Sequence, residues 1–123
     1  MLTGFKDLKV YQKAYDLSME IFQLSTAFPK EEIYSLTDQM RRSSRSVCAN
    51  IAEAFRKRGY PKLFRLALTN ADSEASETIV WIDYAKDCGY MSDKVHTYLS
   101  QGYKEVGKIL GKIILHPHRF ITR

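Results

Sequence analysis

Apolar residues recur three and four positions apart along almost the whole chain, and this spacing is the strongest constraint on its fold. In the first segment, Val10, Ala14, Leu17 and Ile21 form one such row, which places their side chains on one face of an α-helix. No segment shows the two-residue alternation of a β-strand. The pattern predicts four helices, at about residues 7–27, 35–58, 61–88 and 92–115.

Four amphipathic helices with short connections predict an all-α fold, an antiparallel up-down-up-down four-helix bundle. The 123 residues suffice for one hydrophobic core, so we expect a single domain over residues 1–123.

Proline, glycine and serine mark the predicted helix ends. Pro29 ends the first helix, because the residue before a proline is disfavoured in the α region. Gly59 is a predicted stop in the left-handed conformation, and Gly89 is predicted to stop the third helix. Pro61 suits a first helical turn, and Ser92 is a predicted N-cap.

The fourth segment contains three glycines that cost about 1 kcal/mol each inside a helix. We expect close backbone packing to compensate at these positions, which are Gly102, Gly107 and Gly111.

Positive charge is concentrated in the middle of the chain. Eight basic residues and one acid, Glu53, give residues 41–65 a charge of +7, although the whole chain carries +5. The basic residues are Arg41, Arg42, Arg45, Arg56, Lys57, Arg58, Lys62 and Arg65. Residues 72–93 are rich in acidic side chains and form an acidic segment. Basic clustering favours binding to a phosphate backbone, and the alternative is a solvated face that pairs with the acidic segment of a neighbouring helix or subunit.

Composition and the first residues of the sequence indicate which classes of protein to expect. No apolar run approaches the roughly 18 residues of a membrane span, and residues 1–7 lack the apolar core of a signal peptide. We therefore expect a cytoplasmic protein with no membrane association. Cys48 and Cys88 are too few for a disulfide framework, and the helical pattern predicts buried free thiols.

Motifs for catalysis or metal binding are missing from the sequence. A di-iron bundle needs Glu-x-x-His pairs, but residues 74–77 have glutamate at both ends. His116 and His118 could hold a metal, although an exposed tail is the favoured interpretation. We predict no catalytic residue, no metal site and no cofactor, and therefore no enzyme.

Polar residues lie beside the predicted core of the second and third helices. We interpret Asn50, Glu53, Glu74 and Glu77 as a structural polar network, with an arginine such as Arg45, that fixes the helix register. Trp81 and Tyr84 beside them fit either core packing or a subunit interface.

Several of these segments resemble the four-helix-bundle proteins encoded by intervening sequences of bacterial large-subunit ribosomal RNA genes. The resemblance covers nearly the whole chain and is strongest at Asn50-Ile51-Ala52-Glu53. The other matching segments are Phe5–Gln12, Pro29–Glu32, Tyr34–Ser44, Ser73, Glu77, Trp81 and Cys88–Tyr90. The chain departs from the family pattern at Ala54, where glycine is usual, and at Tyr60-Pro61, where a serine-type cap is usual.

This resemblance implies a bundle that assembles as a ring-like homopentamer. The accessory variability proteins of diversity-generating retroelements are distantly similar. They are basic pentameric barrels that bind nucleic acid and a reverse transcriptase. The resemblance implies no established biochemical activity for the family at large.

The leading hypothesis is a non-enzymatic homo-oligomer that binds structured RNA or another nucleic acid through the eight basic side chains, with little base readout. The alternative is a protein-interaction scaffold, in which the basic residues contact acidic faces of adjacent subunits or of a protein partner.

Overall fold

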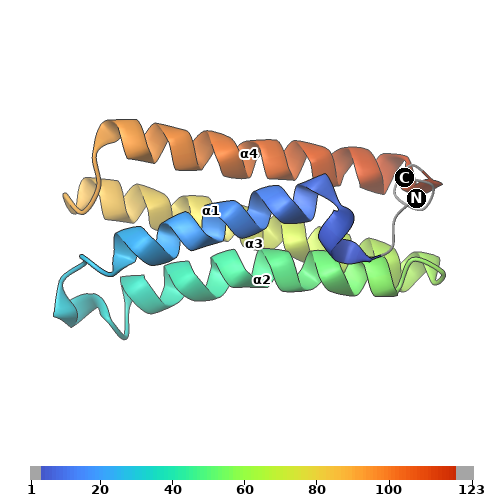
Figure 1. Cartoon of the computed structure of the whole chain (residues 1–123), viewed down its shortest axis with the longest axis horizontal. Coiled ribbons are helices and arrows are strands. Elements are labelled where there is room, and N and C mark those ends of the chain that lie inside the picture. Colours follow the sequence, from blue (N-terminus) through green and yellow to red (C-terminus); the bar gives the residue numbers. More distant parts are fainter. Residues whose placement is uncertain (1–3, 119–123) are drawn as a thin grey trace.

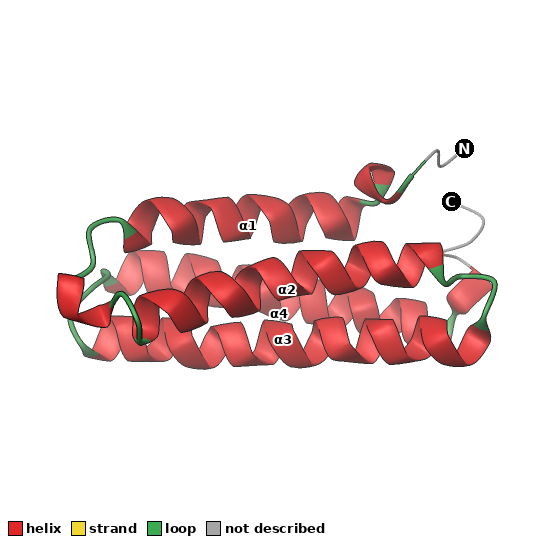
Figure 2. Ribbon diagram, turned by 90° about the horizontal axis from the view of Figure 1, so that it is seen from below, coloured by secondary structure: helices red, strands yellow, loops and turns green. Residues whose placement is uncertain are grey.

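The computed structural model describes residues 4–118 and contains four long helices. They are α1 (Lys9–Ser25), α2 (Leu36–Arg56), α3 (Pro61–Asp87) and α4 (Asp93–Leu115). Successive helices run in opposite directions along one long axis (Figure 1). The connections lie at the two ends of the bundle (Figure 2), and none of the described residues forms a strand. The all-α four-helix bundle predicted from the apolar spacing is confirmed.

Two short 3₁₀ helices were not predicted. The first, η1 (Phe5–Asp7), precedes α1, and the second, η2 (Lys30–Glu32), lies between α1 and α2. The first long helix also ends earlier than predicted, at Ser25. The N–H groups of Thr26 and Ala27 bond to carbonyls three residues back, so the chain tightens before Pro29 is reached.

Of the two glycines predicted to stop helices, Gly89 has the left-handed conformation and Gly59 does not. Gly89 has φ 81°, and the N–H of Tyr90 bonds to the carbonyl of Ala85 at 2.8 Å, which is the Schellman arrangement at a helix C-terminus. The prediction for Gly59 is wrong, because its φ is not positive. There, the N–H of Tyr60 bonds to the carbonyl of Lys57 at 2.8 Å and turns the chain without a left-handed residue.

The predicted start of the fourth helix is confirmed. The hydroxyl of Ser92 accepts a hydrogen bond from the N–H of Val95 at 3.1 Å, which satisfies one of the free donors at the N-terminus of α4. Pro61 stands in the first turn of α3, as predicted.

The turn after α3 is tied to η2 by one side-chain hydrogen bond. The Tyr90 hydroxyl donates to Glu32 Oε2 at 2.9 Å, and this bond raises the pKa of Tyr90 to about 12. A raised pKa in the folded state means that the stabilisation is fully present below the unfolded pKa near 10. The stabilisation is lost as the pH rises through about 12.

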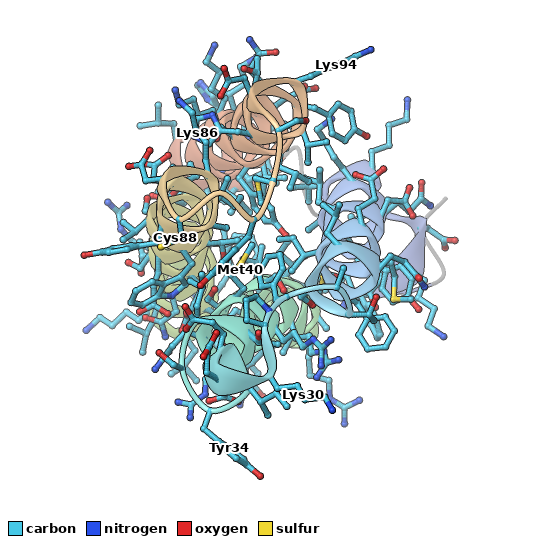
Figure 3. The ribbon with its side chains drawn as sticks, turned by 90° about the vertical axis from the view of Figure 1, so that its left-hand side faces the viewer. Lys30, Tyr34, Met40, Lys86, Cys88 and Lys94 are labelled. Atoms are coloured by element: carbon cyan, nitrogen blue, oxygen red, sulfur yellow. The ribbon has the colours of Figure 1, made fainter. Side chains whose placement is uncertain are left out.

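All four helices contribute to one buried core. The largest side chains that solvent does not reach include Ile21, Met40, Leu68, Tyr103 and Leu110. In the view along the bundle, Met40 lies among the helices (Figure 3). None of the described helices is long and apolar enough to cross a membrane.

The glycines of α4 differ in how closely they are packed. A Cβ at Gly102 would lie 2.6 Å from Leu17 Cδ2, so the Leu17 side chain of α1 packs directly against the Gly102 backbone, and close packing accounts for this glycine. At Gly107 a Cβ would lie 3.2 Å from Asp72 Oδ1. At Gly111 no atom lies within 4 Å, so close packing does not explain this glycine and that prediction is wrong.

We therefore expect opposite effects from two alanine substitutions in the same helix. Gly111→Ala raises the free energy of unfolding by about 0.5–1 kcal/mol, because alanine has the higher helix propensity and meets no neighbour. Gly102→Ala lowers it, because overpacking typically costs about 1–3 kcal/mol and exceeds the same propensity gain. Urea denaturation of both variants measures the two signs, and a gain at Gly102 would contradict the close approach.

The two cysteines occupy different environments. Cys48 is buried, as predicted, and burial raises the pKa of its thiol to about 11. Cys88 is exposed at the end of α3 (Figure 3), so its predicted burial is wrong. It lies in the turn where α3 has already stopped, beyond the buried helix face.

This difference predicts selective thiol chemistry. An alkylating reagent at neutral pH modifies Cys88 in the folded protein and leaves Cys48 intact, because the thiolate is the reactive form and Cys48 is shielded. Mass spectrometry of the intact protein should show one adduct in buffer and two in denaturant. Two adducts in buffer would contradict the buried position of Cys48.

Candidate nucleic-acid interface

The eight basic residues predicted to bind nucleic acid fall into two groups. Arg41, Arg42 and Arg45 lie in the first half of α2, and we call them the helix group. The turn group surrounds the connection between α2 and α3, at the end of the bundle where α1 begins and α4 ends (Figure 1). Its members are Arg56, Lys57, Arg58, Lys62 and Arg65.

The helix group is held against the end of α1. Arg41 Nε donates to Ser25 Oγ at 2.8 Å, and its guanidinium carbon lies 4.8 Å from the centre of the Phe22 ring. The Arg45 guanidinium carbon lies 6.0 Å from the same ring. Cation–π contacts of this kind hold a guanidinium in place while its outer edge stays in water.

Arg42 is the member of the helix group with an acidic partner. Its Nη2 lies 3.9 Å from Asp38 Oδ2, one helical turn earlier. Both side chains are exposed, so this pair is weak and a phosphate can displace the carboxylate.

The turn group is also partly ordered by an aromatic ring. The Arg58 guanidinium carbon lies 4.0 Å from the centre of the Phe55 ring, and Arg58 Nη1 donates to the Phe55 carbonyl at 2.7 Å. Lys62 and Arg65 are exposed in the first turns of α3.

One exposed strip of α2 connects the two groups. At about 100° per residue, Arg42, Arg45 and Arg56 fall within about 60° of one another around the helix. All three side chains are exposed. Arg45 and Arg56 are separated by roughly 16 Å along the axis at about 1.5 Å per residue.

The acidic segment does not neutralise these groups within the chain. Two of its members pair elsewhere: Asp83 Oδ1 lies 2.7 Å from His96 Nε2, and Asp93 Oδ1 lies 3.8 Å from Lys86 Nζ. Apart from Arg42, none of the eight basic side chains makes an ion pair with another described residue. Pairing with a neighbouring helix of the same chain therefore does not account for the basic cluster.

The residues predicted as a polar network are not joined in this chain. Asn50 Nδ2 donates to the Ser46 carbonyl at 2.8 Å within its own helix. The side chains of Glu53 and Glu77 are exposed, and Glu74 is half-buried. Over residues 4–118, no hydrogen bond or ion pair links these four side chains.

One buried polar contact joins α2 and α3 instead. Thr78 Oγ1 donates to Ser43 Oγ at 2.8 Å, and both residues are fully buried. Ser43 and Thr78 each lie three and four residues from buried apolar side chains of the same helix, so the periodicity places them in the core. The hydrogen bond between them could not be predicted, because it depends on the relative register of α2 and α3, and the apolar spacing within each helix does not give that register.

The aromatic pair on α3 divides between core and surface. Trp81 packs against the hydrophobic core, whereas Tyr84 is exposed, and their ring centres lie 5.9 Å apart.

Residues 4–118 contain no group of three or more histidine, cysteine, aspartate or glutamate side chains that could hold a metal ion. The rings of His116 and His118 lie 6.0 Å apart, centre to centre, after the end of α4.

Comparison with known proteins agrees with this architecture. Residues 6–112 match the model of the 23S rRNA-intervening sequence protein family. No curated protein matches the chain. Among solved structures, a protein of unknown function from the S23 ribosomal protein family of Bacteroides thetaiotaomicron VPI-5482 is similar, with a TM-score of 0.77 and 26% sequence identity. The alignment covers 85% of this chain and 94% of that one. The family resemblance seen in the sequence is thereby confirmed, and the chain belongs to the 23S rRNA-intervening sequence protein family.

Proposed function

We propose that this protein binds structured RNA, or another nucleic acid, through the helix group and the turn group of α2 and α3. The observation that carries the proposal is that these basic side chains, Arg42 excepted, have no acidic partner among the described residues. Small cations condense around a nucleic-acid backbone. Unpaired lysine and arginine side chains that neutralise its phosphates displace these counterions, and their release drives binding.

The proposed recognition is of backbone and shape. The two rings beside the arginines, Phe22 and Phe55, are covered by guanidinium groups, so they are not open platforms for stacking bases. Exposed arginine and lysine side chains on the outside of a helix suit contacts to phosphates along a duplex.

The proposal includes two further properties: the protein is a homo-oligomer, and it has no enzymatic activity. The family resemblance implies a ring of five copies, of about 70 kDa from a 14.3 kDa chain. Repetition of the site around such a ring would multiply a weak affinity per subunit by avidity. We also propose that the protein is cytoplasmic, where it has access to RNA.

Gel filtration with light scattering, with and without a short RNA duplex, tests the proposal against the scaffold alternative. We expect an oligomer that co-migrates with RNA at about 50 mM salt and releases it at about 200 mM salt, because phosphate contacts weaken steeply with salt. An oligomer that ignores RNA at low salt but dissociates into smaller species at high salt would favour the scaffold. In that case the basic residues join subunits and do not bind RNA.

A further inference from the structure

Two exposed apolar side chains protrude at the end of the bundle where α2 begins. Tyr34 is 96% exposed and Ile33 is 48% exposed, and both lie in the turn between η2 and α2. Seen from this end, the Tyr34 side chain points away from all four helices (Figure 3). A tyrosine this exposed adds little to the stability of its own fold, and aromatic side chains are enriched in interfaces. We call Ile33 and Tyr34 the Tyr34 knob.

An apolar groove opens between α1 and α4 at the same end of the bundle. Its volume is about 400 Å³. Pockets that hold drug-sized ligands have roughly 300–1,000 Å³, so the groove has room for a tyrosine side chain. We call it the α1–α4 groove, and its walls include Met19, Glu20 and Leu24 of α1 and Val95, Tyr98 and Leu99 of α4.

The groove also offers an acceptor for a tyrosine hydroxyl. The Tyr98 hydroxyl donates to Glu20 Oε1 at 3.3 Å. A carboxylate has about four lone-pair sites, so Glu20 can accept a second hydrogen bond. A tyrosine hydroxyl usually finds a partner when its ring is buried. With its ring in the groove, Tyr34 can therefore donate to Glu20.

Charges beside the knob and beside the groove are complementary. Lys30 and Glu31 are exposed next to the knob, and Glu20 and Lys94 are exposed at the groove. None of these four side chains makes an ion pair with another described residue. When a knob enters a groove, Lys30 can pair with Glu20, and Glu31 can pair with Lys94. Such rim charges contribute mainly to orientation and specificity.

The knob and the groove lie at one level along the bundle and face different directions. α1 ends and α4 begins at the end where α2 begins (Figure 1). Seen from that end, Tyr34 projects beyond α2, whereas Lys94, next to the groove, projects on the α4 side (Figure 3). A knob that points away from the groove of its own chain can enter only the groove of another copy. Contacts between two different surfaces are heterologous and generate closed rings when the rotation closes.

We infer that the Tyr34 knob of one copy of this chain binds in the α1–α4 groove of the next copy. The inference rests on the homo-oligomer of the proposed function and names the contact that joins its copies. Because knob and groove share one level along the axis, copies meet side by side, which suits a ring better than an open filament. Neither surface includes a member of the helix group or the turn group.

Two variants that each lose one half of the contact test this inference. Tyr34→Asp removes the knob, and Tyr98→Asp places a carboxylate in the groove beside Glu20. Each variant alone should be monomeric in light scattering, at 14.3 kDa. Mixed together, they should form a species of about 29 kDa, twice the mass of one chain. The intact knob of the Tyr98→Asp chain then binds in the intact groove of the Tyr34→Asp chain.

Tyr84→Asp on α3 is the matched control, since Tyr84 is 57% exposed, as is Tyr98. This variant should keep the wild-type mass. The inference is overturned if Tyr34→Asp keeps the wild-type mass, if Tyr84→Asp lowers the mass equally, or if the mixture contains no two-chain species. Circular dichroism of each variant checks that the helices are intact.

Reversal of one charge pair tests the orientation of the knob in the groove. Lys30→Glu and Glu20→Lys should each lower the particle mass at low salt, because each places like charges together. The double variant should restore the wild-type mass, and absence of this rescue would contradict the pairing. All masses are measured without RNA. An intact ring that ignores RNA would therefore overturn only the proposed RNA binding, and RNA binding with an unchanged Tyr34→Asp particle would overturn only the knob contact.

Discussion

Replacing Arg56, Lys57 and Arg58 together with alanine should weaken binding to an RNA duplex on the order of 100-fold near 0.1 M salt. These residues are the three consecutive members of the turn group, and none of them makes an ion pair with a described residue. Each phosphate contact contributes about 0.9 to the slope of log affinity against log salt for a duplex, so losing three should reduce the slope by about 2 to 3. Fluorescence anisotropy at several salt concentrations measures both quantities.

The matched control removes the same charge from another face. Lys104, Lys108 and Lys112 recur every four residues on exposed positions of α4, and their triple alanine variant has the same net charge as the turn-group variant. We expect little loss of affinity and a nearly unchanged slope for this control. Equal losses in both variants would mean that net charge drives binding and would remove the turn group from a specific site.

Leu110→Ala should lower the free energy of unfolding by about 2–5 kcal/mol. Leu110 is fully buried in α4, so truncation removes apolar contacts and leaves a cavity that close-packed neighbours fill only in part. Thermal or urea unfolding of the variant gives the loss of stability.

The same substitution at the end of the same helix is the control. Leu115 is 75% exposed, and Leu115→Ala should change the free energy of unfolding by no more than about 0.5 kcal/mol. Similar losses for the two variants would contradict the orientation of α4 against the core.

The helices were predictable because their apolar spacing repeats over several turns, and a long periodic signal tolerates local exceptions. Helix ends depend on one or two hydrogen bonds and were less predictable. Gly59 illustrates this difference, because the bond from Tyr60 to Lys57 turns the chain without the left-handed residue that Gly89 supplies. Cys88 falls one residue beyond α3, where helical periodicity no longer describes which side is buried.

The candidate site was predictable in its charge and not in its geometry. Basic residues can be counted in a sequence, and residues 41–65 stand out by their charge alone. The contacts of Arg41 with Ser25 and Phe22 join residues from different helices, so they depend on how α1 crosses α2. The predicted network around Asn50 is not present among the described residues, because the Asn50 amide donates to the Ser46 carbonyl of its own helix.

The salt dependence of RNA binding tests the central claim most directly. Wild-type protein is titrated onto two RNA duplexes of unrelated sequence, with anisotropy recorded between about 50 and 200 mM salt. We predict similar affinities for both duplexes and a linear fall of log affinity with log salt. Absence of binding at the lowest salt, or binding that salt does not weaken, would contradict recognition of the phosphate backbone by this basic surface.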